Sequence, residues 1–178
     1  MILLMGIAGS GKGTQGKMLA DTRGFHLVSM GDVIRMYVTG KQRERMLQGD
    51  LLDDQEIITI VDKVLALLPE GEEVVLDGFP RTITQAQWLI DQAKAGRFKV
   101  DKAFHLVVPR EVVKDRLVNR GRIDDTENAI EARFDQYDKS TMPLLSWLSE
   151  HGVKVVNVNA KRSVREVNKD LVNYLEAD

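Results

Sequence analysis

The chain has 178 residues, of which 43% are hydrophobic and 29% are charged, and its formal net charge is −2. This length suits one α/β domain with a single buried core and is short for two domains. The near-neutral charge excludes a general attraction to nucleic acid or acidic membranes, so any basic site must be local. The absence of cysteine excludes disulfides and thiolate zinc sites, and it fits a cytoplasmic protein.

The N-terminal segment reads as a short buried strand followed by a glycine-rich turn. Residues 2–5 are apolar, too few for a signal peptide core or a membrane span. Residues 6–14 then read GIAGSGKGT. A strand that leads through such a turn into a helix points several backbone N–H groups and the helix dipole at one anion. The spacing GxxxxGK is that of a P-loop, in which Lys12 reaches the β- and γ-phosphates of a nucleotide.

This predicted phosphate cradle departs from the usual pattern at one position. Gly13 follows the lysine where Ser or Thr normally holds magnesium, and the hydroxyl comes one place later, at Thr14. We therefore expect Mg²⁺ to be held mainly by water and phosphate. A simple tight connection or a dinucleotide loop is the alternative, but the third glycine of Rossmann spacing is missing. The residues predicted to bind the donor phosphates here are Gly9, Ser10, Gly11, Lys12, Gly13 and Thr14.

Short β-rich segments alternate with stretches of helical periodicity along the rest of the chain. The predicted strands are residues 2–5, 26–28, 74–76, 103–108 and 153–158. Helical patterns cover residues 57–68, which Pro69 ends, and residues 111–119. Another runs from 126 to 148 and contains Pro143, which should kink or interrupt it. The alternation predicts a three-layer α/β fold, with a five-stranded parallel sheet covered by helices on both faces.

Polar sequences follow the first three predicted strands. Besides the P-loop, residues 29–32 read SMGD and residues 77–81 read DGFPR. Ligands of an open parallel sheet bind beyond the carboxyl ends of its strands, so one crevice can collect all three sequences. Asp77 ends an apolar strand, the position from which P-loop proteins hold magnesium through water. The planar guanidinium of Arg81 suits a phosphate, although an ion pair with Asp77 that closes the turn is the alternative.

Five sequences occur along the chain in a definite order: GIAGSGKGTQ at 6–15, SMGDVIR at 29–35, DGFPRTITQ at 77–85, DRLVNRGRIDD at 115–125, and Arg133. Together they resemble the adenylate kinases, a family of P-loop nucleoside monophosphate kinases, over nearly the whole length. The resemblance implies one P-loop domain over residues 1–178, with an abbreviated NMP-binding arm at 29–58 and a minimal lid at 116–125. It also implies reversible phosphoryl transfer from Mg-ATP to AMP, giving two ADP, with Mg²⁺ as cofactor.

The resemblance also implies a set of residues around the acceptor nucleotide. Arg35 and Arg81 would hold the α-phosphate of AMP, and Gln85 with the backbone near Leu52 would read its base. The family usually has Thr where this chain has Met30, so a kinase of the same fold acting on UMP or CMP stays open as an alternative. The predicted AMP-binding residues are Met30, Arg35, Leu52, Gly78, Arg81 and Gln85. Asp32 would position Arg35 or, equally, cap a helix over residues 33–38.

A second group of arginines lies near residue 120. Arg116 and Arg120 are four apart on a predicted helix, where like charges cost a few tenths of a kcal/mol. A bound anion would offset this repulsion, and neutralisation by Asp124 and Asp125 is the alternative. The resemblance implies that Arg116, Arg120 and Arg162 bind ATP and that the catalytic residues are Lys12, Arg81, Arg116, Arg122 and Arg133. An ATPase switch is the alternative outside the kinases, and the arginine set favours transfer over it.

The lid segment is shorter than the resemblance leads one to expect. Only Gly121 separates Arg120 from Arg122, where even short-lid relatives insert several residues. We therefore expect a less well sealed site, with more ATP hydrolysis than in long-lid relatives, or cover supplied by a neighbouring subunit. A monomer is the default expectation and a small homo-oligomer the alternative, with ATP and AMP as partners and neither nucleic acid nor membrane. The three histidines lack metal-ligand spacing and are expected to be structural.

Overall fold

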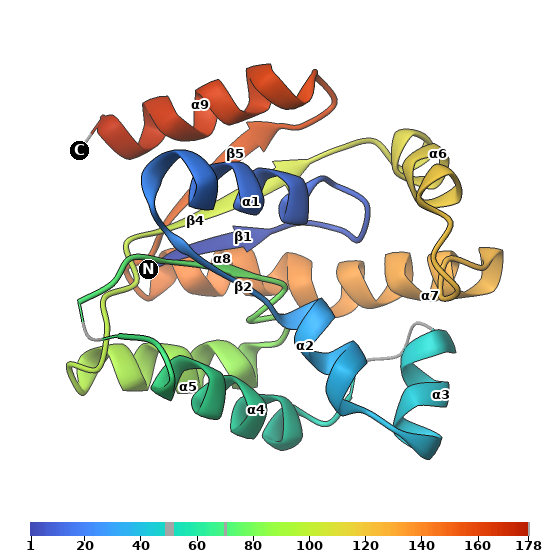
Figure 1. Cartoon of the computed structure of the whole chain (residues 1–178), viewed down its shortest axis with the longest axis horizontal. Helices are drawn as coiled ribbons and strands as arrows, with labels where there is room; N and C mark the ends of the chain where they lie inside the picture. The colour runs from blue at the N-terminus through green and yellow to red at the C-terminus, as the bar shows by residue number, and fades with distance from the viewer. Residues whose placement is uncertain (49–51, 70, 178) are drawn as a thin grey trace.

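The computed structural model of the protein describes residues 1–48, 52–69 and 71–177 (Figure 1). Its centre is one sheet of five parallel strands in the order β2-β3-β1-β4-β5. The strands are β1 (Ile2–Met5), β2 (His26–Ser29), β3 (Val74–Asp77), β4 (Lys102–Val107) and β5 (Lys154–Asn159). All lie within one residue of the predicted bounds, so the predicted five-stranded parallel sheet is confirmed.

Helices cover both faces of this sheet. They are α1 (Lys12–Arg23), α2 (Met30–Tyr37), α3 (Gly40–Gln48), α4 (Asp54–Ala66), α5 (Ile83–Lys94), α6 (Arg110–Arg120), α7 (Glu127–Gln136), α8 (Met142–Glu150) and α9 (Val164–Glu176). In Figure 1, α1 and α9 lie above the sheet, and α4, α5 and α8 lie below it. The predicted three-layer α/β architecture is therefore confirmed.

The alternation of side chains along β1 explains the two halves of the core. Ile2 and Leu4 face the layer of α1 and α9, where they pack with Phe104 of β4. Leu3 and Met5 face the opposite layer, with residues of α4, α5 and α8. Because both faces are covered, the strand is a continuous apolar run, and this is why so short a sequence is recognisable. β1 is thus fixed at the centre, with the glycine-rich turn directly beyond it.

The helix predicted over residues 57–68 begins earlier than its apolar pattern. Asp53 is the N-cap of α4, and its carboxylate accepts hydrogen bonds from the backbone N–H groups of Gln55 at 2.9 Å and Glu56 at 3.2 Å. Such a cap satisfies N–H groups that have no partner inside the helix. The first turn of α4 is therefore polar, which hides it from a search for apolar periodicity. The helix ends at Ala66, ahead of Pro69 as expected.

Pro143 interrupts the helix predicted from 126 to 148, as expected. α7 ends at Gln136, a π-helical turn η1 (Tyr137–Thr141) follows, and α8 begins at Met142 with Pro143 in its first turn. The N–H of Met142, the residue before the proline, donates to the Tyr137 carbonyl five residues back, so the π turn leads directly into α8. The π turn, a form often found at functional sites, brings Tyr137 to the carboxyl edge of the sheet.

The alternative role of Asp32 as the cap of a helix over residues 33–38 is wrong. α2 begins at Met30, immediately after β2, and Ser29 occupies its N-cap position. Met30 is completely buried, so the helix starts where its first side chain enters the core. Asp32 lies in the first turn instead, where its charge is still favourable to the helix dipole, and it forms an ion pair with Arg35. This contact agrees with the other predicted role of Asp32, positioning Arg35.

Two groups of helices flank the carboxyl edge of the sheet. α2 and α3 continue from β2, and α6 and α7 continue from β4, with α3 in contact with α7. The predicted arm, residues 29–58, contains both α2 and α3, but its residues 49–51 lie outside the described part of the chain. The predicted lid is the end of α6 with the turn to α7. The division of the chain into one domain with these two segments stays a prediction.

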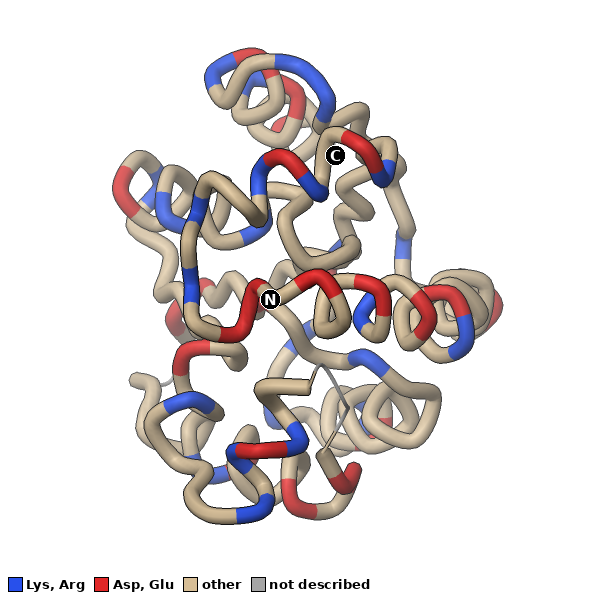
Figure 2. Tube along the Cα trace, turned by 90° about the vertical axis from the view of Figure 1, so that its right-hand side faces the viewer, with Lys and Arg blue, Asp and Glu red and all other residues tan. Residues whose placement is uncertain are grey.

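Charge is interspersed over the molecule. In Figure 2, Lys and Arg alternate with Asp and Glu along most elements, as expected from a net charge of −2. Within the described residues, none of the helices combines the length and apolar character that crossing a membrane requires. Any strongly basic site must therefore arise from local convergence of a few side chains.

Truncating the centre of the sheet should strongly destabilise the fold. Phe104 is completely buried between β4 and the layer of α1 and α9. We expect Phe104→Ala to lower the free energy of unfolding by about 3–5 kcal/mol, because apolar contact is lost and a cavity is left. Urea unfolding followed by circular dichroism measures this change. The control is Val118→Ala on α6, where 68% of the side chain is exposed and the change should stay below about 0.5 kcal/mol. Equal losses in the two variants would contradict the packing described.

Candidate active site

The glycine-rich turn forms a compact loop between β1 and α1. The Ser10 N–H donates to the Ile7 carbonyl at 3.1 Å, and Gly11 adopts a left-handed conformation with φ of 104° at the N-cap of α1. Gly9 lies directly against α6, since an added Cβ would approach Leu117 Cγ to 2.9 Å. The loop backbone is thus open toward an anion on one side and packed on α6 on the other.

Lys12 lies in the first turn of α1, with its ammonium group folded back over the loop. Nζ donates to the carbonyls of Gly6 at 2.7 Å and Ile7 at 3.0 Å. Desolvation lowers the pKa of Lys12 to about 8, with Arg81 and Arg120 adding to the effect and Asp77 opposing it. The lysine is therefore held among other cations, and an arriving anion would stabilise its charged form.

The end of β3 supplies a carboxylate and a guanidinium to the same edge. Asp77 is 9% exposed, and its Oδ2 is 3.6 Å from where a Cβ on Gly13 would lie, so it faces the first turn of α1. Arg81 Nε donates to the Gly78 carbonyl at 2.9 Å, and among the described residues this bond, rather than an ion pair with Asp77, holds the guanidinium. Desolvation lowers the pKa of Arg81, the charge of Asp77 opposes this shift, and the charges of Arg133 and Arg35 add to it.

The carboxylates after α6 partly neutralise the arginine group. Arg120 makes two bonds to Asp125, from Nε at 2.8 Å and from a terminal nitrogen at 2.6 Å. Arg133 on α7 bonds to both Asp125 at 3.0 Å and Asp124 at 2.5 Å. These bonds hold the pKa of Asp125 below its usual value even though desolvation opposes them. The predicted neutralisation by these carboxylates is therefore present for Arg120, whereas Arg116 donates to backbone carbonyls.

Arm and lid meet through one shared carboxylate. Asp32 on α2 forms an ion pair with Arg35, and Arg122 in the lid turn lies 3.7 Å from the same oxygen. Desolvation lowers the pKa of Arg122, with Arg120 and Arg35 acting in the same direction. Two guanidinium groups from opposite sides of the edge thus share a single counter-charge.

Arg116 and Arg162 lie on the other side of the loop. Arg116 donates to the Ala160 carbonyl at 2.9 Å and to the Ser10 carbonyl at 3.4 Å, so it bridges the glycine-rich loop and the segment after β5. Arg162 donates to the Asn159 carbonyl at 3.3 Å and pairs with Asp170 of α9. Both side chains are oriented by protein groups before any ligand arrives.

These side chains surround two adjoining depressions. The main cleft lies between the arm, the lid and the ends of β1 and β3, and the side hollow lies between α1, α6 and the start of α9. Predicted site residues that line the main cleft are Gly9, Lys12, Arg35, Asp77, Gly78, Arg81, Arg120, Arg122 and Arg133. Those that line the side hollow are Gly9, Ser10, Gly11, Gly13, Thr14, Arg116, Arg120, Arg122 and Arg162. Residues scattered over much of the chain therefore converge on one edge.

Three predicted acceptor residues lie behind this surface. Met30 and Leu52 are buried in the core beneath the sheet, and Gln85 is 2% exposed at the start of α5. None of the three lines the main cleft or the side hollow in the structure of the described residues. Their contact with an acceptor base stays a prediction. Gln85 nevertheless lies next to a residue that lines the main cleft, because its Oε1 accepts a hydrogen bond from the backbone N–H of Arg81 at 2.8 Å.

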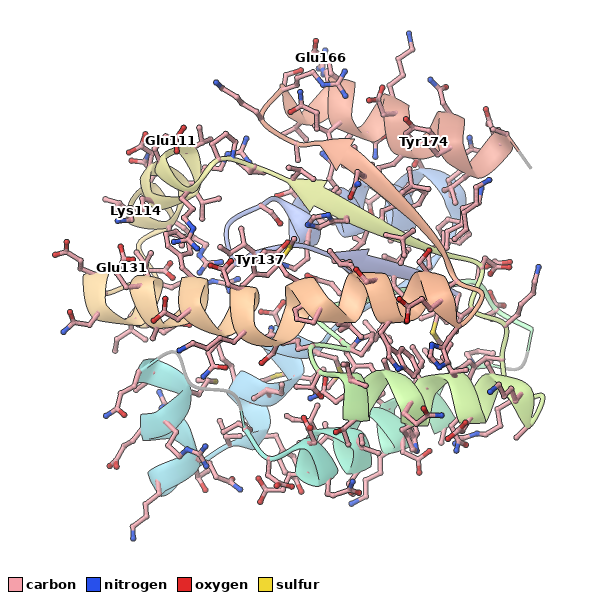
Figure 3. The ribbon with its side chains drawn as sticks, turned by 180° about the vertical axis from the view of Figure 1, so that it is seen from behind. Glu111, Lys114, Glu131, Tyr137, Glu166 and Tyr174 are labelled. Carbon is pink, nitrogen blue, oxygen red and sulfur yellow. The ribbon has the colours of Figure 1, made fainter. Side chains whose placement is uncertain are left out.

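A buried polar chain that the sequence did not reveal reaches the main cleft. His105 on β4 bonds through Nδ1 to Asn157 Oδ1 at 2.7 Å and through Nε2 to the Tyr137 hydroxyl. Burial lowers the pKa of His105, helped by the nearby Lys12 charge, and burial raises that of Tyr137 to about 12. Figure 3 shows Tyr137 between the helical layer and the strands, and its ring lines the cleft. The expected structural role of His105 agrees with these bonds, which hold Tyr137.

The base of the lid is braced on its outer side. Lys114 of α6 and Glu131 of α7 face each other in Figure 3 and form an ion pair. Phe134 packs beneath them, with Arg110 Cζ 5.1 Å and Lys114 Nζ 5.8 Å from its ring centre. Such cation–π contacts add to the packing of the two helices. These contacts hold α6 and α7 together at the base of the segment that carries the lid arginines.

Comparison with known proteins decides the family. A family model described as adenylate kinase matches residues 4–153. The chain belongs to the adenylate kinase family. It is similar to the adenylate kinase of Synechococcus sp. (strain CC9902), with 33% identity over 98% of each chain. It is also 34% identical to that of Phocaeicola vulgatus, over 98% of this chain and 97% of the relative, and 32% identical to that of Corynebacterium urealyticum, over 94% of each.

Membership confirms the resemblance drawn from the motifs. As an adenylate kinase family member, the protein is a nucleoside monophosphate kinase, and the motifs that identify it surround the main cleft and the side hollow. Nothing in the comparisons favours the ATPase switch or the UMP/CMP kinase. The individual roles of the predicted site residues stay predictions.

The lowered pKa of Lys12 makes nucleotide binding depend on pH. The ammonium form attracts phosphate, and in the free enzyme it is lost as the pH rises through about 8. With Mg²⁺ in excess, the Kd for ATP should therefore rise about tenfold between pH 7 and pH 9, as measured by calorimetry. Lys12→Arg, which stays charged over this range, should show a nearly flat dependence whatever its affinity. Parallel curves for the two proteins would contradict the assignment.

Proposed function

We propose that this kinase transfers the γ-phosphoryl group of Mg-ATP to the α-phosphate of AMP, giving two ADP. The observation that carries the proposal is that the main cleft and the side hollow adjoin, with Gly9, Ser29, Arg120 and Arg122 lining both. The side hollow measures about 760 Å³, within the range of roughly 300–1,000 Å³ that ligand pockets occupy, and the main cleft measures about 180 Å³, below that range. Two nucleotides placed in them would meet end to end beside Lys12.

The donor would lie over the glycine-rich loop. The N-terminus of α1 and the backbone of residues 9–14 would cradle its phosphates, as expected for a P-loop. Arg116, Arg120 and Arg162 would hold the nucleotide from the side of the hollow. This role agrees with the position of Arg116, whose carbonyl partners belong to the loop and to the segment after β5.

The acceptor would enter the main cleft from the side of the arm. Arg35 and Arg81 would bind its phosphate, because their planar guanidinium groups form paired bonds to oxyanions. Gly78 would allow close approach of the phosphate, and Gln85 with the backbone near Leu52 would read the base. Gln85 and Met30 are buried, so the base would reach Gln85 only if the arm, which contains Met30, moved away from α5 when AMP binds.

Transfer itself needs positioning and positive charge more than acid–base chemistry. As the bond from the γ-phosphorus to the bridging oxygen of ATP breaks, an oxygen of the AMP phosphate forms the new bond, and charge spreads over the phosphoryl oxygens. Lys12, Arg81, Arg116, Arg122 and Arg133 would stabilise that charge. The attacking phosphate is already ionised at neutral pH, so no general base is required. Substrate phosphates would take over the guanidinium contacts that Asp32, Asp124 and Asp125 make in the free enzyme.

The residues present fit a magnesium ion held mainly by the substrates. Asp77 presents a carboxylate toward the first turn of α1, and the described residues contain no group of three or more acidic, histidine or cysteine side chains able to hold a metal. Asp77 would therefore hold Mg²⁺ through water, with phosphate oxygens as the direct ligands. The ion would supply neutralisation of charge between the β- and γ-phosphates.

The short lid bears on how well the site excludes water and on whether a second subunit covers it. Arg120 pairs with Asp125 across the turn, which leaves little chain to fold over the donor. We expect ATP hydrolysis, relative to transfer, to exceed that of long-lid relatives. We also propose a cytoplasmic monomer, with a small homo-oligomer as the alternative that would add cover from a neighbouring subunit.

The choice of acceptor tests the reaction directly. With Mg-ATP as donor, initial rates measured by chromatography of the nucleotides should be highest with AMP among AMP, CMP, UMP and GMP. Each AMP consumed should yield two ADP, and a reaction without acceptor measures hydrolysis. A ligand that joins two adenosines through five phosphates should bind and inhibit. A higher rate with CMP or UMP would mean that one of these, and not AMP, is the acceptor. Binding of ATP without binding of the two-adenosine ligand would indicate an ATPase switch.

The role of Arg81 predicts a selective loss of transfer. Removing one charged contact to a phosphate should cost about 2 kcal/mol or more, so Arg81→Ala should lower kcat/KM for AMP at least about thirtyfold. Arg97→Ala is the matched control, since Arg97 pairs with Asp62 at 2.6 Å and does not line either depression. A loss within about threefold for Arg81→Ala would remove this residue from the acceptor site.

A further inference from the structure

The amide of Gln85 is bound at both of its ends. Oε1 accepts a hydrogen bond from the backbone N–H of Arg81 at 2.8 Å, and Nε2 donates to Asp54 Oδ1 at 2.8 Å. The side chain is 2% exposed, so water does not replace these partners. The position and the direction of the amide are therefore both set by the protein.

Asp54 is itself fixed from a second direction. It is the first residue of α4, and the same Oδ1 accepts from the Thr82 hydroxyl at 3.0 Å. Thr82 is the N-cap of α5, and its hydroxyl oxygen accepts from the Gln85 N–H at 3.3 Å. One carboxylate oxygen thus joins the start of α4 to the start of α5 and holds the glutamine between them.

The two partners of Gln85 differ in kind, and this prevents the amide from turning over. A carboxylate only accepts hydrogen bonds, and a backbone N–H only donates. Rotation of the amide by half a turn would place Oε1 against the Asp54 carboxylate and Nε2 against the Arg81 N–H. Both contacts would be repulsive and buried, so only one orientation is stable.

An amide held in one orientation can distinguish two classes of base. Its two partners use one N–H and one lone pair, which leaves one donor and one acceptor. A 6-amino purine offers an acceptor at N1 beside a donor amino group, and a 6-oxo purine offers an N1–H donor beside an acceptor oxygen. The two edges present the same pair of functions in opposite order, so a freely turning glutamine fits both and a locked glutamine fits one.

We propose that Asp54 is a specificity-determining residue that locks the Gln85 amide and thereby excludes 6-oxo purine monophosphates from the acceptor site. The inference rests on the proposed function, in which Gln85 reads the base of AMP. Asp54 acts through Gln85 and is a positioning residue. It selects between bases and leaves the charges around the transferred phosphoryl group unchanged.

Asp54→Asn tests the lock with little change in shape. An amide at position 54 can donate or accept, so the turned orientation of Gln85 loses one of its two repulsive contacts and keeps only the one with the Arg81 N–H. We expect the ratio of kcat/KM for inosine monophosphate to kcat/KM for AMP to rise about tenfold. The change should appear in the KM values of the two acceptors, and kcat for AMP should stay within about twofold of its original value. The probes differ only at the edge in question.

Asp53→Asn is the matched control. It removes the same charge from the same helix start, Asn caps a helix as well as Asp does, and the described contacts of Asp53 are to the N–H groups of its own helix. Its ratio of inosine monophosphate to AMP should equal that of the unchanged enzyme. The thermal unfolding midpoint of each variant checks the fold, and Asp54→Ser, whose hydroxyl also donates and accepts, replaces Asp54→Asn if that variant does not fold.

The outcomes separate the inference from the proposed function. An unchanged ratio in a folded Asp54 variant overturns the lock, and so does an equal change in Asp53→Asn, which would mark an effect of charge alone. If the unchanged enzyme does not prefer AMP, the proposed function fails first, whatever the variants do. A rise confined to the Asp54 variants supports the lock.

Discussion

The mutual repulsion of cations at one edge of the sheet is the constraint around which the site is organised. Lys12, Arg81 and the arginines of the arm and lid lie close enough to shift one another's pKa values. The free protein balances them with Asp32, Asp124 and Asp125, whose oxygens take up guanidinium hydrogen bonds. A phosphate can replace these carboxylates, because carboxylate and phosphate oxygens accept the same hydrogen bonds from a guanidinium group. Substrate binding is then an exchange of acceptors, in which the protein has already oriented its donors and desolvated part of their charge.

The fold was largely predictable because its signals are local. Each strand is a short apolar run buried on both faces, so its bounds are found within one residue, and the polar sequences after β1, β2 and β3 must lie together once the strands are parallel. Helix starts were less predictable. α4 begins with polar capping residues, and α2 begins with the burial of Met30, neither of which an apolar period reveals. The interruption at Pro143 was predictable, whereas the π turn of Tyr137–Thr141 that precedes it was not.

The site divides in the same way. The glycine-rich loop and most of the arginines follow from motifs, and all but Met30, Leu52 and Gln85 of the predicted site residues line one of the two depressions. What the sequence could not supply are partners distant along the chain. His105 meets Tyr137 and Asn157 only because β4, β5 and the π turn come together, and Gln85 meets Asp54 only because α4 and α5 start side by side. Such pairings depend on tertiary geometry, so a residue with an unremarkable neighbourhood in sequence can still govern the chemistry of another.

The contact between Gly9 and Leu117 bears on how a protein of this kind can change in size. The side chains of Val113 and Leu117 on α6 lie directly against the backbone of Gly9, so movement of that helix along its axis would disturb the loop. The helix stops at Arg120, where Gly121 turns the chain with φ of 62°. New residues inserted at this turn would project from the end of a clamped helix and leave the loop untouched. The turn is therefore the place where added residues would disturb the glycine-rich loop least, although they would also separate Arg120 from Arg122 and Asp125.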